Sequence, residues 1–426
     1  MSFLAKNRIY NMWEVLMMSY LKNYFESSKK NRIALVGANS QGKTYQLDQL
    51  SKMCNGKVIF VESETKSDEN MKNSAEKTTL IEWITELIGL DDVNTVIDNI
   101  ISRIKIDNSN ERVSVELKNS VKSYKGLIEF AMKSNNNSKE LAGSGERVLG
   151  QLIMIDNILY DNNSKYEYLI VDEPEAHLHP SLYYLIAKTL NNISHRGIKV
   201  AIATHSEEIL KYFVEDSNEI IMMKDLIPIP LKNTDYYYNL KDSIACYEDD
   251  SLMMKSYKRI KDKDKLYFKT IMFDGIYKAL FSNTVIIGEG VIEEELFNLY
   301  LNKYYENYYN KNVCSIISYG KEMIPWYISI LNDIGINNLC IYDCDNEDSS
   351  KHKFLNEYIE TNANKKIKIT ANGKNDLEHF LGIEINDGDK GKYDISEIRY
   401  LYLNDNEKLM GLLKQINDLV NELNEK

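Results

Sequence analysis

Residues 33–53 decide the fold of the first half of this chain, and they read IALVGANSQGKTYQLDQLSKM. The apolar run Ile33–Val36 predicts a short strand, the run Gly37–Thr44 predicts a loop, and the apolar spacing from Tyr45 to Met53 predicts a helix. The loop fits the pattern G-x-x-x-x-G-K-[ST], in which backbone N–H groups converge on phosphate oxygens at a helix N-terminus. The order strand, loop, helix is the context that this pattern requires.

Small or flexible residues in such a loop let the backbone approach the phosphates, and we assign Gly37, Asn39 and Gly42 to nucleotide binding. Lys43 is expected to reach the β and γ phosphates. Thr44 is expected to supply a hydroxyl oxygen to Mg²⁺. The loop therefore predicts a site for ATP with Mg²⁺.

Two further apolar runs are expected to be strands that bring polar residues to this site. The run Tyr166–Val171 is nearly continuous, as in a strand buried on both faces, and Asp172 and Glu173 follow it. Asp172 could hold Mg²⁺ through water, and Glu173 could polarise the attacking water. The run Lys199–Ala203 leads to His205, which is suited to reach a γ-phosphate from the side.

Four segments resemble, in order, the Walker A, signature, Walker B with D-loop, and H-loop motifs of ABC-type ATPases of the SMC, RecF and OLD groups: Gly37–Thr44, Leu141–Arg147, Val171–Pro180 and Ala203–Ser206. The resemblance implies a head-to-head dimer that sandwiches ATP. It implies that Ser144 of one subunit touches the γ-phosphate bound by the other. A Q-loop glutamine and the adenine contact cannot be placed. His177 and His179 fit no metal-ligand spacing and are interpreted as structural.

The second half of the chain predicts another parallel α/β sheet, because strands and helices alternate along it. The predicted strands are Thr284–Gly288, Val313–Ile317, Asn338–Asp343 and Lys366–Thr370, and the predicted helices are Ile292–Tyr305 and Ile324–Ile334. Strand carboxyl ends meet at one edge of a parallel sheet, where ligands collect.

Carboxylates lie at the ends of two of these strands, namely Glu289 directly after the first, Asp343 as the last residue of the third and Asp345 two residues later. Grouped carboxylates repel each other unless a divalent cation neutralises them, and Mg²⁺ or Mn²⁺ prefers such oxygen ligands. Two ions about 3.5 to 4 Å apart could activate water and stabilise the leaving oxygen of a phosphodiester. The alternative is that these carboxylates only cap the helices that follow.

The pattern of glutamate-glycine at one strand end and D-x-D at a later one resembles a Toprim domain. Phe281–Glu293 and Asp376–Glu378 look like the version in OLD-family nucleases. That resemblance implies metal ligands or bases, and a catalytic lysine that is either Lys392 or Lys390. The implied ligands or bases are Glu289, Glu293, Asp343, Asp345 and Glu378. Gly288 stands where relatives have a bulky apolar residue, so we expect a loosened strand end.

Length and composition agree with more than one domain. Over 426 residues we expect an ATPase domain with an N-terminal helix at 1–230, a linker at 231–283, a Toprim domain at 284–395 and a helical segment at 396–426. Pro228 and Pro230 are expected to mark where the chain leaves its first core. A net charge of −12 limits any DNA contact to a local surface. Five cysteines without C-x-x-C spacing and no membrane-spanning run indicate a reducing cytoplasm.

The sequence thus favours an ATP-binding, metal-dependent DNA endonuclease. The resemblance to OLD-family nucleases, which include Gabija-type and retron-associated effectors, implies anti-phage defence and a partner such as a helicase or a reverse transcriptase with its RNA. One alternative is a non-nucleolytic ATP switch, a sensor or recombination-type DNA-binding protein with an inert Toprim fold. Another is an RNA or tRNA nuclease toxin that a partner releases.

Overall fold

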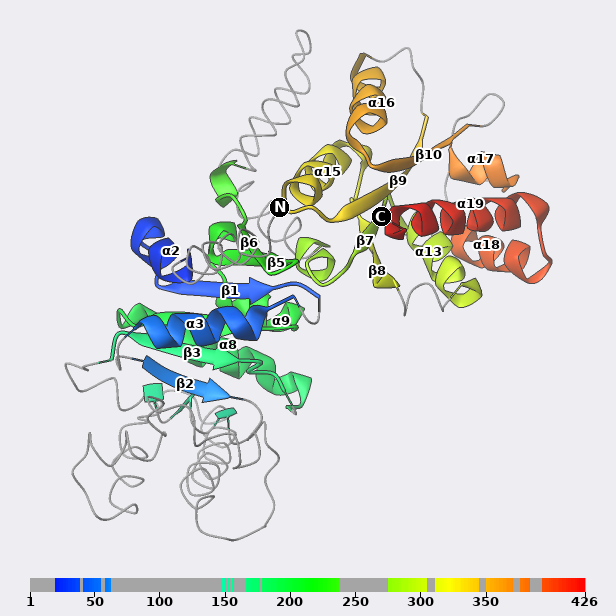
Figure 1. Ribbon diagram of the computed structural model, residues 1–426. Helices are drawn as coiled ribbons and strands as arrows, with labels where there is room; N and C mark the ends of the chain where they lie inside the picture. Colours follow the sequence, from blue (N-terminus) through cyan, green and yellow to red (C-terminus); the bar gives the residue numbers. More distant parts are fainter. Residues whose placement is uncertain are drawn as a thin grey trace, which may run out of the picture. The chain divides into compact units, whose positions relative to one another are not determined.

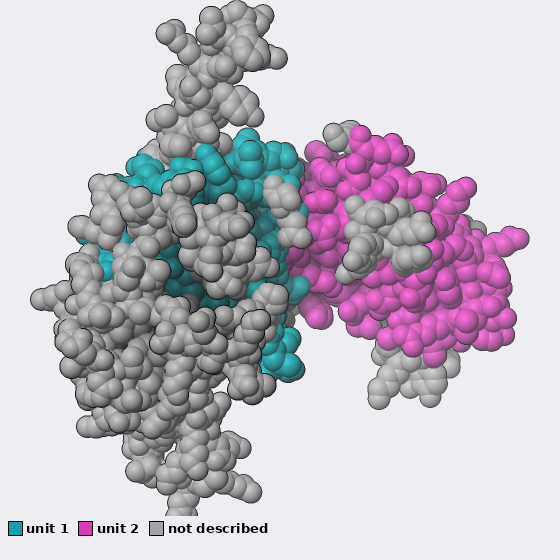
Figure 2. Space-filling view, turned by 60° about the horizontal axis from the view of Figure 1, so that its bottom comes forward, with its two compact units in different colours: residues 1–229 teal, residues 230–426 magenta. Residues whose placement is uncertain are grey.

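The computed structural model describes residues 20–38, 41–54, 58–62, 148–149, 152–153, 155–156, 166–176, 178–236, 275–304, 311–344, 350–370, 376–383 and 393–425. The chain divides into two compact units, Met1–Ile229 and Pro230–Lys426, which Figure 2 shows in different colours. Each unit has its own sheet and its own apolar core. Most of the predicted linker 231–283 lies outside the described residues, so the proposed domain boundaries stay predictions.

In the described part of the first unit, six strands form one sheet in the order β2-β3-β4-β1-β5-β6 (Figure 1). The strand pairs that join β2 through β5 are parallel. Central strands of such a sheet are covered on both faces, which explains their apolar sequences. The strands are β1 (Arg32–Val36), β2 (Val58–Glu62), β3 (Tyr168–Asp172), β4 (Lys199–Ala203), β5 (Ile220–Lys224) and β6 (Ile227–Pro230).

The register of this sheet brings three strand ends to the same level. Ala203 at the end of β4 lies opposite Leu35 of β1 and opposite Asp172 of β3. The glycine-rich loop, the pair Asp172–Glu173 and His205 therefore leave the sheet at one carboxyl edge, which is where parallel sheets bind ligands.

The helices of the first unit complete this core. They are α2 (Tyr20–Ser28), α3 (Lys43–Met53), α8 (Tyr183–His195) and α9 (Glu207–Phe213), with short 3₁₀ turns at Pro180–Leu182 and Ser217–Glu219. Leu21 and Phe25 of α2 are buried among residues of the sheet and of α3, and Tyr24 donates a hydrogen bond to the carbonyl of Asn218 at 2.5 Å. The rest of the predicted N-terminal helix lies outside the described residues.

The three runs predicted as strands of this unit match β1, β3 and β4 to within two residues at either end. The expectation that the chain leaves its first core at Pro228 and Pro230 agrees with the division of the chain between Ile229 and Pro230. Pro228 itself is still buried in β6, at the outer edge of the sheet. Proline lacks the N–H that a ladder needs, and an edge strand tolerates that loss.

In the described part of the second unit, four parallel strands are ordered β10-β9-β7-β8 (Figure 1). All four predicted strands are confirmed, two of them at both ends. They are β7 (Thr284–Gly288), β8 (Val313–Ile317), β9 (Asn337–Asp343) and β10 (Lys365–Ile369). Because β7 is central, the carboxyl ends of β9 and β8 flank its own, and the predicted acidic residues leave from adjacent strands.

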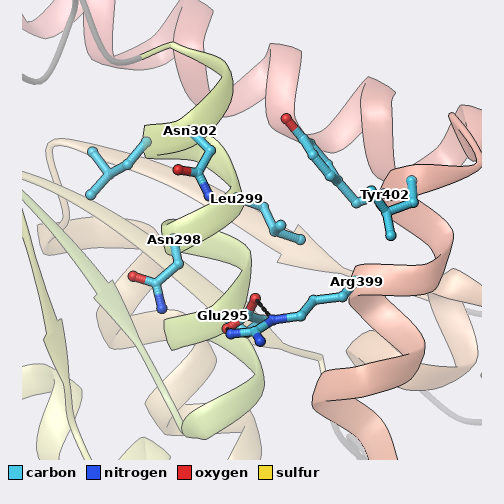
Figure 3. Close-up of a pocket in the computed structure, with 8 residues that line it drawn as sticks. Glu295, Asn298, Leu299, Asn302, Arg399 and Tyr402 are labelled. Carbon is cyan, nitrogen blue, oxygen red and sulfur yellow. Dashed lines mark hydrogen bonds and ion pairs between the residues drawn. The ribbon is translucent and has the colours of Figure 1, made fainter.

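Helices α15 and α16 lie on one face of this sheet, and α13, α18 and α19 lie on the other (Figure 1). The helices are α13 (Val291–Lys303), α15 (Ile324–Asp333), α16 (Ser350–Asn362), α17 (Leu377–Leu381), α18 (Tyr393–Leu403) and α19 (Glu407–Asn424), with a 3₁₀ turn, η4, at Lys321–Met323. The α19 residues Leu413 and Ile416 share one core with the strands. Arg399 of α18 donates to both carboxylate oxygens of Glu295 on α13, at 2.6 and 3.1 Å, beside a surface pocket (Figure 3).

No helix in the described ranges combines the length and apolar character that crossing a lipid bilayer requires.

Candidate functional site

The glycine-rich loop connects β1 to α3, and Gly37 begins it with a φ of 130°. A Cβ at this position would lie 2.5 Å from the carbonyl oxygen of Met223 on the neighbouring strand β5. Both the left-handed backbone and this close approach exclude a larger residue. The sequence therefore has glycine here because β5 is packed directly against the start of the loop.

Lys43 is the first residue of α3, and its side chain folds back into the loop. Its ammonium donates to the carbonyls of Gly37 and Ala38, at 2.9 and 3.0 Å. Burial lowers the pKa of Lys43 to about 8, against the opposing effect of the carboxylates of Glu173, Asp172 and Glu175. Thr44 is exposed in the first turn of α3. The loop thus presents a largely charged cation and helix N–H groups at the same place, as phosphate binding requires.

Asp172 is the last residue of β3, and Glu173 follows it at the same carboxyl edge of the sheet. The backbone N–H of Glu173 donates to the carbonyl of Ala203 at 2.8 Å, and its φ is 49°. A left-handed backbone is uncommon for a residue other than glycine, and such strain is concentrated at functional sites. The turn directs Glu173 toward His205, whose Nε2 lies 3.7 Å from Oε1 of Glu173.

His205 follows β4 and faces this acidic residue as a neutral imidazole. Burial, together with the nearby charge of Lys43, lowers its pKa to about 4, so the ring is uncharged at neutral pH. The contact with Glu173 at that pH is therefore a contact between a neutral ring and a carboxylate.

Glu175 is a residue of this site to which the sequence analysis gave no role. Its carboxylate accepts a hydrogen bond from the backbone N–H of His205, and burial raises its pKa. The side chain thereby fixes the loop that carries His205. The sequence signal was the second glutamate of Glu173-Pro174-Glu175, directly after the acidic pair.

The structure brings Gly37, Gly42, Lys43, Asp172, Glu173 and His205 to one edge of the first sheet. Asn39, Ser144 and His177 lie outside the described residues. His179 has a local structural role, as predicted: its Nδ1 accepts from the N–H of Ser181 at 3.2 Å at the start of a 3₁₀ turn.

In the second unit, two of the predicted strand-end acidic residues contact each other, through the backbone of one and the side chain of the other. The backbone N–H of Asp343, at the end of β9, donates to Oε1 of Glu289 at 3.1 Å. Glu289 directly follows β7, the strand that pairs with β9. Neighbouring parallel strands with acidic residues at their carboxyl ends thus create a local concentration of negative charge.

Glu293 lies on the first turn of α13, and its carboxylate accepts from the N–H of Gly290 at 2.8 Å. Burial raises the pKa of Glu293, and the charge of Glu378 raises it further. Glu378 lies in α17, whose N-cap is Asp376. Glu293 and Glu378 are therefore near enough for their charges to interact.

Gly288 does not loosen the end of β7, and that expectation was wrong. The residue is buried and pairs with Ile317 of β8, and its carbonyl accepts a hydrogen bond from Ser318 Oγ at 3.0 Å. A Cβ at Gly288 would lie 2.4 Å from the Cβ of Glu293. Glycine here lets Glu293 pack onto the strand end.

The donors present are all carboxylates, which is the chemistry that a hard divalent cation selects. Within the ranges that the structure describes, no group of three or more histidine, cysteine, aspartate or glutamate side chains is arranged to hold a metal ion. Asp345, Lys390 and Lys392 lie outside those ranges. The described carboxylates therefore fit a divalent cation in kind, and the full ligand set stays a prediction.

Lys321 is a second residue that the sequence analysis did not single out. It lies in the loop after β8, is buried, and donates from Nζ to the carbonyl of Asp343. The available signal was a lysine shortly after the apolar run Val313–Ile317, at the strand end where ligands collect.

Comparisons with known proteins match the two kinds of domain. Residues 81–210 match the family model described as an AAA ATPase domain, and residues 280–345 match the one described as an Overcoming lysogenization defect protein-like TOPRIM domain. Endonuclease GajA of Bacillus cereus (strain HuB5-5) is 25% identical over 237 residues, which are 51% of this chain and 32% of that protein. Old nuclease of Escherichia phage P2 is 27% identical over 179 residues, which are 42% of this chain and 27% of that protein.

The chain thus matches about a third or less of the length of these two relatives. Among solved structures, cbiO1 from Clostridium perfringens, part of the ABC transporter complex cbiONQ, is 16% identical over 50% of this chain and 82% of its own, with a TM-score of 0.27. So low a score adds nothing to the assignment, for which the parallel sheet, the glycine-rich loop and the family models are the evidence.

An ATPase domain and a Toprim domain imply the use of a nucleotide and of a divalent metal ion. The chain joins a P-loop ATPase domain to an OLD-like Toprim domain.

Proposed function

We propose that this chain binds and hydrolyses ATP and is a divalent-metal-dependent endonuclease acting on DNA, an effector of anti-phage defence in a prokaryotic cytoplasm. The observation that carries the proposal is the contact at 3.1 Å between Asp343 N–H and Glu289 Oε1, which joins the ends of two strands with acidic residues. The names of the two relatives, an endonuclease and a nuclease, support the same activity.

In the ATPase unit we assign Lys43 and the loop residues Gly37, Asn39 and Gly42 to the phosphates. Thr44 and Asp172 would hold Mg²⁺, Glu173 would polarise the attacking water, and His205 would contact the γ-phosphate. The neutral state of His205 suits a hydrogen bond to the phosphate without added charge. Ser144 would come from a second subunit, so ATP hydrolysis would require a homodimer.

In the Toprim unit the proposed metal ligands or bases are the five carboxylates predicted from the sequence: Glu289, Glu293, Asp343, Asp345 and Glu378. Lys392 is the proposed catalytic lysine, with Lys390 as the alternative. A divalent cation, Mg²⁺ or Mn²⁺, would supply an activated water and neutralise charge on the phosphodiester. The residues of this chain would position that cation and limit repulsion between their own carboxylates.

Incubating the purified chain with supercoiled plasmid and with tRNA, in Mg²⁺ or Mn²⁺, with and without ATP, tests this proposal. We expect plasmid nicking that depends on the divalent ion and is lost in Glu289→Gln. The matched control is Glu294→Gln, which removes an exposed carboxylate at the start of α13 and should nick normally.

The other possible outcomes of this cleavage assay would each indicate a different class of protein. Cleavage of tRNA alone would indicate an RNA nuclease, and no cleavage in any condition would indicate a non-nucleolytic ATP switch. Nucleotide affinity of Lys43→Ala tests the ATPase assignment separately: we expect binding to be lost, and an unchanged affinity would contradict the assignment of the loop.

A further inference from the structure

Lys321 places a buried ammonium at the carboxyl edge of the second sheet. Its residue exposure is 6%, its Nζ donates to the carbonyl of Asp343, and the same atom lies 5.2 Å from the ring centre of Tyr342. A buried charge costs free energy unless it is paired or hydrogen bonded, so a lysine in this position needs a specific reason. Both contacts are to the last two residues of β9.

The loop that carries Lys321 also holds the end of β7. Ser318 Oγ donates to the carbonyl of Gly288 at 3.0 Å, and the N–H of Gly320 donates to the carbonyl of Glu289 at 3.0 Å. Residues 318–321, which we call the bridging loop, thus connect the ends of β7 and β9. These are the two strands from which Glu289 and Asp343 leave the sheet.

Lys321 lies where Glu289 and Asp343 leave the sheet. Its Nζ donates to the carbonyl of Asp343, and its neighbour Gly320 donates to the carbonyl of Glu289. By contrast, Lys365 and Lys366 of the neighbouring strand β10 pair with Glu422 and Glu360 on partly exposed surface. Both are surface ion pairs. Among the described residues, neither pair has a hydrogen bond or ion pair to Glu289 or Asp343.

From this geometry we infer that Lys321 is a positioning residue for the metal site, holding the Asp343 backbone at the end of β9 so that Asp343 and Glu289 face the same cation. The inference rests on the proposed function, because it needs a divalent ion at those carboxylates. Outer residues that orient metal ligands typically change metal affinity or activity by about 10- to 100-fold when replaced.

The test is the affinity of the full chain for Mn²⁺, measured by calorimetry or by the electron paramagnetic resonance of free Mn²⁺. Lys321→Met keeps the length of the side chain and removes the charge and the donor. We expect it to weaken Mn²⁺ binding by about 10- to 100-fold and to lower kcat for plasmid nicking without a matching rise in KM. Lys366→Met, on β10, is the control and should leave both quantities unchanged.

Urea unfolding of each variant distinguishes loss of positioning from loss of the fold. If Lys321→Met does not fold, Lys321→Gln, which retains a shorter donor, should show the same weakening of Mn²⁺ binding. Unchanged Mn²⁺ affinity in either folded variant, with a wild-type chain that binds Mn²⁺, would overturn the role of Lys321 alone. A wild-type chain that binds no Mn²⁺ would instead overturn the metal site, and with it both the proposed function and this inference.

Discussion

Gly288 is the last residue of β7, and its α-carbon lies against the side chain of Glu293. The contact matters because Glu293 lies in the first turn of α13 and accepts a hydrogen bond from Gly290. A side chain at position 288 would occupy the volume of the first two side-chain carbons of Glu293. The identity of this residue is thus set by a neighbour five positions later, through the turn from strand to helix.

Gly288→Ala should destabilise the Toprim unit by about 1 to 3 kcal/mol, since the added methyl group would lie 2.4 Å from the Cβ of Glu293 in a buried site. Urea unfolding followed by circular dichroism measures the change. Gly411→Ala is the matched control, because Gly411 lies in α19 with open space where its Cβ would be. That substitution should stabilise by up to about 1 kcal/mol. A Gly288→Ala chain as stable as wild type would show that the turn adjusts without cost.

At the scale of elements, Arg32 ties the start of β1 to the segment between α9 and β5. Its guanidinium donates to Asn191 at 3.1 Å and to Glu215 at 2.8 Å, and lies 3.5 Å from Glu219, whose side chain is 2% exposed. The hydrogen bond from Arg32 lowers the pKa of Glu215 to about 2, whereas burial raises the pKa of Glu219. The two shifts differ because Glu215 is half exposed and Glu219 is enclosed.

Arg32→Met should destabilise the ATPase unit by about 3 kcal/mol at pH 7, since it removes a cation from the buried carboxylate of Glu219. The folded-state pKa of Glu215 is depressed, so its stabilisation is present above pH 4.5 and is lost as the pH falls toward 2. The contribution of Glu215 to the free energy of unfolding is small, because its side chain is 55% exposed. The difference between wild type and variant should therefore narrow below pH 4.5.

Chemical unfolding of both proteins at pH 7 and pH 3 measures this narrowing. Lys52→Met provides the control, because Lys52 pairs with Asp48 on the surface of α3 and its loss should change stability by less than about 0.5 kcal/mol. A difference between wild type and Arg32→Met that stays constant across this pH range would rule out a role for the acidic partners.

At the scale of the whole molecule, the two units have separate apolar cores in the part of the chain that the structure describes. The core of the second unit includes helix α19, which lies more than 60 residues after the end of β9. Stability of the Toprim unit therefore depends on helix α19, whereas the described residues of the glycine-rich loop belong to the first unit.

Leu413→Ala tests this separation. Leu413 is fully buried in the second core, so the substitution should destabilise that unit by about 2 to 5 kcal/mol. Affinity for a fluorescent ATP analogue should not change, because the loop of residues 37–44 lies in the other unit. Leu403→Ala, at a side chain that is 79% exposed, should leave stability unaltered. An ATP affinity that falls with Leu413→Ala would show that the two cores are coupled.

The positions of the described strands other than β6 were predictable from local patterns, as were the glycine-rich loop and the strand-end carboxylates. Continuous apolar runs mark strands covered on both faces, and residues 37–44 carry a loop whose spacing is fixed by phosphate geometry. The carboxylates Glu289 and Asp343 were found because each directly follows such a run. In each case the signal lies within a few neighbouring residues.

The amino-acid sequence by itself determined that a phosphate-binding loop and strand-end carboxylates occur in this chain, since those patterns are local. Only the tertiary structure decided the order of the strands, the edge position of β6, the support of His205 by Glu175 and the contact of Lys321 with Asp343. Those features depend on residues 20 or more positions apart, which packing of the sheets brings together, or on which strands become neighbours. The local sequence around a single lysine or glutamate does not predict which distant residue the fold will place beside it.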